Sequence, residues 1–260
     1  MSGFDTDVLL KRLEEFPLAA SCFRDYVLWL APRAGADGSQ YDVIQMLETA
    51  DTPRLEKLES RLTESKSILN INENEFVRIF GFDNDLLSTD PEKVHDILAE
   101  PLLVLDLDHF GFREIKKLPT FYGTPKNKIR NADFTARYRN CTVAIELKTI
   151  RMENNPPPVP GKLLGNALKP DWWGDMFRRN AITKIEDKER RALVQIATAQ
   201  INYNCDKGML VLYSRRLGPS TLMSRSDYIE ELQALLVRYP AIDFMAVKNY
   251  FAETVLVQRQ

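Results

Sequence analysis

The sequence contains few of the residues that build most compact metal centres. Its 260 residues include 2 histidines, His95 and His109, and 3 scattered cysteines, Cys22, Cys141 and Cys205. Two histidines are too few for a His-rich metal centre, and no paired cysteine spacing indicates a structural zinc site. An odd number of scattered cysteines also excludes a disulfide framework.

A long apolar run and a large net charge are also missing. No stretch approaches the roughly 18 apolar residues of a membrane span, and the N-terminal MSGFDTDVLLKRLEEF lacks the basic start and apolar run of a signal peptide. We therefore expect a cytoplasmic protein with no membrane segment. The 35 basic and 37 acidic residues give a net charge of −2, which excludes a globally basic nucleic-acid-binding surface but allows local basic patches.

The N-terminal quarter of the chain has the periodicity of helices. Apolar residues recur at helical spacing over residues 5–30, 41–50 and 53–69, and the loop APRAGADGSQ separates the first two of these segments. We expect residues 1–70 to form a helical module and residues 71–260 to form the main domain. The module is either a packing extension without chemistry or a surface for a protein partner or a homodimer.

The main domain mixes helical and strand patterns. The predicted elements, in chain order, are a short helix from Asn72 to Gly81, a helix over 91–100, a strand-like run over 102–112 that is also compatible with a buried helix end, a hairpin over 131–150, an irregular stretch up to Asn180 that contains PPPVP, a helix over 183–203, a strand over 208–214, a helix over 226–238 and two short final strands. This mixture predicts an α/β fold.

The predicted hairpin NADFTARYRNCTVAIELKTI has a distinctive charge pattern. Asp133 lies at its first strand, and after twelve further residues the second strand carries Glu146, Leu147 and Lys148. Alternation along a strand places Glu146 and Lys148 on the same face and Leu147 on the other. Two carboxylates and an ammonium on one face suit Mg²⁺, which prefers one or two carboxylates together with waters and phosphates. The alternative is a solvated face with a structural Glu–Lys pair.

This pattern resembles the PD-(D/E)xK nuclease superfamily. The order of a helix, strands that carry Asp and then Glu-x-Lys, a helix with Gln and a further strand covers residues 70–215. Ala132 stands where the family usually has Pro. The resemblance implies an αβββαβ nuclease core, in which a mixed central sheet is flanked by helices, with the residues 1–70 as an N-terminal helical extension.

The family often carries a Gln on the helix that follows the Glu-x-Lys strand. Gln195 occupies this place here, and Gln200 is the alternative. The two lie five residues apart, which is about 140° around a helix, so they cannot face the site equally. Where the exonuclease-like branch has Tyr four residues after the Gln, this chain has Ala199, and Tyr203 is displaced.

The first core helix of the family usually supplies a further acid. Glu73 shares the side of Phe76 and Phe80, and we assign it to the site. Glu75 is better explained as a capping residue of the helix that starts after Asn72, and Glu92 is the alternative if the core helix is the one over 91–100.

The resemblance implies a Mg²⁺-dependent or Mn²⁺-dependent DNA endonuclease or exonuclease. Asp133 and Glu146 would hold the metal, which would activate the attacking water. Lys148 would position that water or offset transition-state charge, and Gln195 would orient the water or the phosphate. The alternative is a non-catalytic nucleic-acid-binding or protein-assembly module that kept the fold, and a third possibility is an unrelated α/β domain that binds no metal.

Two groups of basic residues are candidates for contacts with DNA. The segment that leads into Asp133 carries five basic residues and no acid: Lys116, Lys117, Lys126, Lys128 and Arg130. Arg178 and Arg179 lie in the irregular stretch together with Trp172, Trp173 and Phe177. The aromatic rings there could stack on bases, or the loop could fold back with its tryptophans buried.

Asp106 and Asp108 share a face of the predicted strand. They form either a second acidic cluster or part of an ordinary edge strand.

Overall fold

The computed structural model describes residues 4–32, 42–82, 93–122, 129–150, 171–186, 192–214, 224–249 and 254–259. The chain divides into two compact units, Met1–Phe110 and Gly111–Gln260. The division therefore lies further along the chain than the boundary expected after residue 70. The reason is that the next two helices, α5 (Glu73–Phe80) and α6 (Lys93–His109), pack on the N-terminal ones.

The first unit is entirely helical in its described part. Its helices are α1 (Thr6–Leu13), α2 (Pro17–Leu30), α3 (Asp42–Glu48), α4 (Thr52–Leu69), α5 (Glu73–Phe80) and α6 (Lys93–His109). Asparagine and aspartate side chains cap several of these helices. Among them, Asn72 accepts a hydrogen bond from the backbone N–H of Glu75 at 2.9 Å, which confirms the predicted start of α5. Aromatic rings such as those of Phe23 and Phe82, 5.3 Å apart, fill the core of this unit.

The run over residues 102–112 was expected to be strand-like in part, with a buried helix end as the alternative, and the structure shows the helix end for residues 102–109. They continue α6 to His109, and the first strand begins only at Phe112. Leu102, Leu103 and Leu107 are all buried, and a short apolar run that is buried on most sides has the same pattern in a helix as in a strand. Asp106 and Asp108 consequently do not share a face, because residues that are two positions apart on a helix point in directions about 200° apart.

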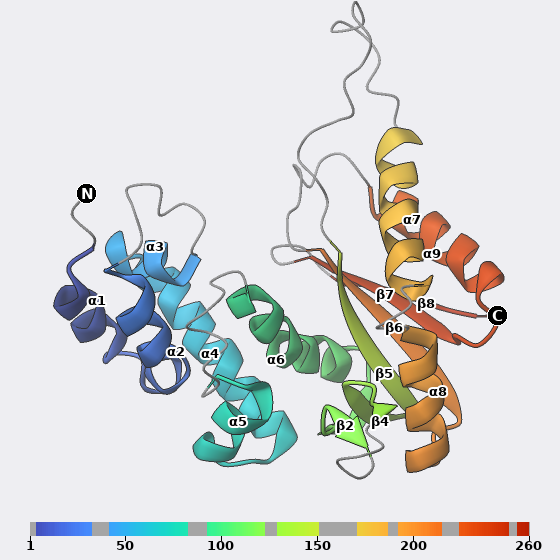
Figure 1. Ribbon diagram of the computed structural model, residues 1–260, viewed down its shortest axis with the longest axis horizontal. Coiled ribbons are helices and arrows are strands. Elements are labelled where there is room, and N and C mark those ends of the chain that lie inside the picture. The colour runs from blue at the N-terminus through green and yellow to red at the C-terminus, as the bar shows by residue number, and fades with distance from the viewer. Residues whose placement is uncertain are drawn as a thin grey trace, which may run out of the picture. The chain divides into compact units, whose positions relative to one another are not determined.

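The second unit contains a six-stranded mixed sheet (Figure 1). Its strand order is β1 (Phe112–Lys117), β4 (Phe134–Tyr138), β5 (Cys141–Ile150), β6 (Lys207–Ser214), β7 (Phe244–Asn249) and β8 (Val255–Gln258). β5, β6 and β7 run parallel, and the outer pairs are antiparallel. The short strands β2 (Phe121–Tyr122) and β3 (Ile129–Arg130), which lie between β1 and β4 in the sequence, form a separate two-stranded ribbon. The α/β class, the hairpin over 131–150 and the later strands are confirmed.

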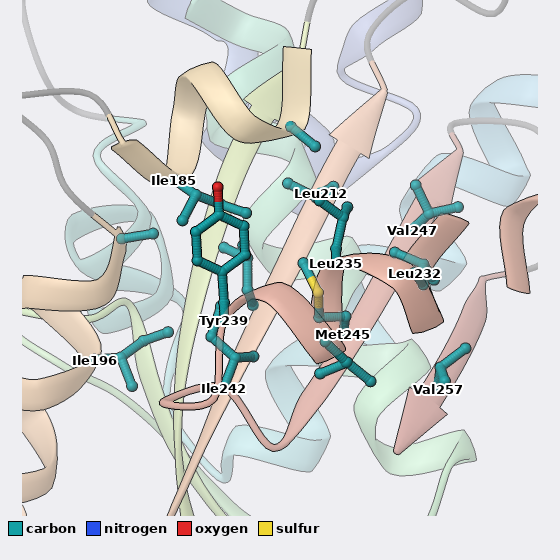
Figure 2. Packing of buried hydrophobic residues seen from close by; sticks show 14 of the residues in the cluster. Ile185, Ile196, Leu212, Leu232, Leu235, Tyr239, Ile242, Met245, Val247 and Val257 are labelled. Atoms are coloured by element: carbon teal, nitrogen blue, oxygen red, sulfur yellow. The ribbon is translucent and has the colours of Figure 1, made fainter. Parts of the chain in front are cut away.

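Three helices pack on one face of this sheet: α7 (Asp171–Glu186), α8 (Ala192–Tyr203) and α9 (Arg225–Arg238) (Figure 1). Figure 2 shows part of the buried cluster between them and the sheet, with Ile185, Ile196 and Leu235 from the helices and Leu212 and Met245 from the strands. Ala144 and Ile150 of β5 belong to the same core. Glu146 and Lys148 alternate with Leu147 and share the parity of Ala144 and Ile150, so they lie on this helix-covered face.

Two further expectations about this region need correction. The stretch up to Asn180 was expected to be irregular, but α7 begins at Asp171. The predicted helix over 183–203 is divided between α7 and α8, and residues 187–191 are outside the described residues. The stripe Phe177, Ala181 and Ile185 repeats every fourth residue and packs into the core.

None of the helices in the described ranges is long and apolar enough to cross a membrane.

Candidate active site

The β4–β5 hairpin positions the two carboxylates of the candidate site. Asp133 lies one residue before β4, and its backbone N–H donates to the carbonyl oxygen of Ile145 at 3.0 Å. Its side-chain Oδ2 accepts a hydrogen bond from the backbone N–H of Leu147 at 2.8 Å. The carboxylate of Asp133 is therefore held against the backbone that carries Glu146, across the two paired strands.

Glu146 is the only buried acid among the described residues. It is 1% exposed, and its Oε1 accepts a hydrogen bond from the ammonium of Lys148. Among the described residues, no donor bonds to its Oε2, which is fully buried. Burial raises the pKa of Glu146 well above its ordinary value, and repulsion from Asp133 adds to this rise, while Lys148 opposes it.

Helix α8 supplies the third group. Gln195 is 3% exposed, and its Oε1 accepts a hydrogen bond from Lys148 Nζ at 2.5 Å. Its Nε2 donates to the carbonyl oxygen of Asn131 at 2.8 Å. Lys148 is thus fixed between a carboxylate of its own strand and an amide of a helix. We call Asp133, Glu146, Lys148 and Gln195 the site cluster. Of the two candidate glutamines, Gln195 is the one that bonds to Lys148.

Two polar residues that the sequence pattern did not assign extend this network. Asn131 Nδ2 donates to the hydroxyl of Tyr203 at 3.0 Å and to the carbonyl oxygen of Pro119 at 3.2 Å. Tyr203 lies two helical turns after Gln195 on α8, so one helix contacts Asn131 twice. The displaced tyrosine of the sequence pattern was the available signal for Tyr203, whereas nothing in the pattern distinguished Asn131.

Lys117, at the end of β1, approaches the site cluster from the neighbouring strand. Its Nζ lies 3.4 Å from Asp133 Oδ1 and 4.8 Å from the centre of the Phe134 ring. Only 12% of its side chain is exposed. Two carboxylates therefore face two ammonium groups in this part of the second unit.

The remaining predicted acid belongs to the other unit. Glu73 lies in the first turn of α5, where its carboxylate accepts a hydrogen bond from the hydroxyl of Ser21. Glu75, whose backbone N–H donates to the capping side chain of Asn72, is in the same turn, and Glu92 is outside the described residues. The contacts that join the site cluster in the second unit do not include Glu73.

The basic residues assigned to DNA contacts have different surroundings. Lys126 and Lys128 lie outside the described residues. Arg130 is half-buried on β3, opposite Phe121. Arg178 makes a two-pronged ion pair with Glu231, with contacts of 2.7 and 2.5 Å, so its charge is already matched by an acid of α9. Arg179 is exposed on α7.

The aromatic residues of the same stretch also have separate places. Trp172 and Trp173 are in the first turn of α7. Phe177 is fully buried, and its ring lies 5.4 Å from that of Tyr228. Phe177 is therefore part of the core that joins α7 to α9 and is not free to stack on a base.

The chemistry of the site cluster fits a hard divalent cation. Within the ranges that the structure describes, no group of three or more His, Cys, Asp or Glu side chains gathers. Two carboxylates are nevertheless sufficient for Mg²⁺, which keeps several waters and binds substrate phosphates. The buried Oε2 of Glu146, which has no protein donor among the described residues, is the kind of atom that a bound cation or its water would satisfy.

Comparisons with models of known families, with curated proteins and with solved structures find no match to this chain. The site cluster is therefore the part of the molecule that indicates a function.

Proposed function

We propose that the protein is a Mg²⁺-dependent or Mn²⁺-dependent nuclease that hydrolyses DNA phosphodiester bonds, with a core of the PD-(D/E)xK type. The observation that carries the proposal is the buried Glu146, whose Oε2 has no donor among the described residues and which lies beside Asp133 and Lys148. A buried carboxylate with an unsatisfied oxygen is costly unless a ligand completes it.

The roles follow from the contacts of each residue. Asp133 and Glu146 would hold the cation, which when bound polarises the phosphate and lowers the pKa of the attacking water. Lys148 is held between Glu146 and Gln195, so its ammonium is preorganised to stabilise negative charge that develops on the phosphate. Gln195 is itself tied to the backbone of Asn131 and fixes the direction of Lys148.

The proposal is tested by cleavage of linear, circular and single-stranded DNA with Mg²⁺ or Mn²⁺. The wild type should cleave, and Lys148→Ala should lose at least about 100-fold in rate, which is typical when a preorganised electrostatic group is removed. Lys207→Ala is the matched control, because Lys207 lies on the adjacent strand β6 and pairs with Asp243 away from the site cluster. It should retain the wild-type rate.

The same assay separates the alternatives. Cleavage of the circular substrate would identify an endonuclease, and its resistance would identify an exonuclease. Absence of cleavage by the folded wild type, with DNA or Mn²⁺ still bound, would favour the non-catalytic binding module. Absence of both cleavage and metal binding would contradict the proposal, and the Glu146–Lys148 pair would then be structural.

A further inference from the structure

Lys117 lies next to the site cluster but has no role in the proposed function. It is the last residue of β1, in register with Phe134 of β4, and its side chain reaches back to Asp133 Oδ1 at 3.4 Å. The Phe134 ring lies beneath its ammonium at 4.8 Å. The Asp133 carboxylate and the Phe134 ring therefore hold the positive charge of Lys117, and Asp133 is also one of the two groups that would bind the cation.

Each carboxylate of the site cluster thus already faces an ammonium. Lys117 faces Asp133, and Lys148 faces Glu146. A divalent cation that enters between the carboxylates meets two positive charges at short range, which opposes its binding. The two lysines differ in how they are held. Lys148 bonds closely to two acceptors, whereas the 3.4 Å contact of Lys117 with Asp133 is longer than the usual charged hydrogen bond.

We propose that Lys117 is a displaceable counterion, which stays paired with Asp133 until a divalent cation and a phosphodiester bind together. Lys117 then leaves Asp133 to the cation, and its flexible side chain turns its ammonium to the phosphate. This inference rests on the proposed nuclease function and adds a control of its metal dependence. The free protein binds the cation weakly, because binding must break the Lys117–Asp133 pair, and the phosphate strengthens binding by taking over the lysine.

The experiment measures Mn²⁺ binding to the full-length protein without DNA, from the electron paramagnetic resonance signal of free Mn²⁺. Lys117→Met removes the charge and keeps most of the side-chain volume, so it should lower the dissociation constant for Mn²⁺ by about tenfold or more. Lys117→Arg keeps the charge and should bind as weakly as the wild type. Lys116→Met removes the same charge from an exposed residue of the same strand and should also leave the affinity unchanged.

A second readout uses cleavage. Lys117→Met should reach its half-maximal rate at a lower Mg²⁺ concentration than the wild type, with a lower maximal rate because the phosphate has lost a partner.

The outcomes separate this inference from the proposed function. Tighter binding in Lys117→Met alone supports the counterion role. Equal affinity in all four proteins, or tighter binding in Lys116→Met as well, overturns that role while the metal site stands. Failure of every variant to bind Mn²⁺ overturns both the metal site and this role.

Discussion

Glu146 concentrates the energetic cost of the candidate site in one side chain. It is buried, its pKa is raised, and its neighbour Lys148 only partly offsets the cost of its negative charge. A group that is destabilised as a charge in the free protein is stabilised when a cation binds. The charged Glu146 therefore lowers the unfolding free energy of the free protein, and a bound cation should raise it again. This change can be measured without knowing the substrate.

The raised pKa of Glu146 predicts how stability depends on pH in a chelating buffer. The folded state holds the Glu146 proton more tightly than the unfolded state, whose pKa is near 4.5. Its stabilising contribution is therefore complete below about pH 4.5 and is lost as the pH rises through the higher pKa of the folded state. Relative to Glu146→Gln, which cannot ionise, the wild type should lose at least about 1 kcal/mol of unfolding free energy between pH 4.5 and 8.

Urea unfolding of both proteins with EDTA present gives this difference at each pH. Parallel curves for the wild type and Glu146→Gln would contradict the raised pKa. Addition of Mg²⁺ at pH 8 should stabilise the wild type and leave Glu146→Gln nearly unchanged, because only the wild type has the full pair of carboxylates.

The two glutamines of α8 provide a matched pair for a second prediction. Gln195→Ala removes an acceptor from Lys148 and the donor to the buried carbonyl of Asn131. It should cost about 2 kcal/mol of unfolding free energy and slow DNA cleavage. Gln200→Ala, on the same helix but half-buried, should cost less than about 1 kcal/mol and leave cleavage intact. Equal losses in both variants, by urea unfolding and cleavage rate, would contradict the role of Gln195.

The charged residues of the hairpin could be assigned from the sequence because strand alternation is a local rule. The period of two places Glu146 and Lys148 on one face, and the structure confirms their contact. Asn131 and Lys117 could not be assigned in this way. Their roles depend on which strand lies beside β4 and on where α8 meets the hairpin, and neither is encoded in the spacing of nearby residues.

At the scale of elements, the candidate site depends on the close packing of α8 against the sheet. Gly208 on β6 makes this approach possible. A Cβ atom built on it would lie 2.6 Å from Ile196 Cγ2 and 3.1 Å from the carbonyl oxygen of Ala241. Gly208 pairs in register with Ala144 of β5, so small residues on two adjacent strands face the helix that carries Gln195.

Gly208→Ala should therefore push α8 away from β6 and cost about 1–3 kcal/mol of unfolding free energy. Because Gln195 moves with the helix, DNA cleavage should also fall. Combining it with Ile196→Ala relieves the closest contact, so the double variant should be less destabilised than the sum of the two single variants. Urea unfolding of the four proteins tests this, and simple additivity would contradict the proposed contact.

Helix α7 shows why some elements could not be predicted from the sequence. Its core stripe of Phe177, Ala181 and Ile185 is interrupted in the sequence by charged and aromatic residues such as Arg178. Arg178 is held by Glu231 of α9, a tertiary contact with an element far along the chain. By contrast, α9 was predicted within a residue of its bounds, because Tyr239-Pro240 follows it directly and ends the helix locally.

At the scale of the whole molecule, the chain consists of two units with separate described cores. The first unit packs its aromatic rings among its own helices, and the second packs α7, α8 and α9 on the sheet. Every residue of the site cluster, together with Lys117, Asn131 and Tyr203, belongs to the second unit. The expected acid Glu73 belongs to the first.

This division leads to a test of whether the first unit contributes to metal binding. A fragment of residues 111–260 carries the whole site cluster, so, once circular dichroism shows that it is folded, it should bind Mn²⁺ within about threefold of the full chain. In the full chain, Glu73→Gln should leave Mn²⁺ affinity unchanged and cost about 1 kcal/mol or less, because the half-buried carboxylate accepts a hydrogen bond from the Ser21 hydroxyl that the glutamine amide oxygen can also accept. A folded fragment that binds Mn²⁺ more than tenfold weaker, matched by the same loss in Glu73→Gln, would instead make Glu73 a ligand. A loss in the fragment alone would mean that the first unit supports the site through other residues. The first unit would then contribute to metal binding and would not be only a surface for a partner.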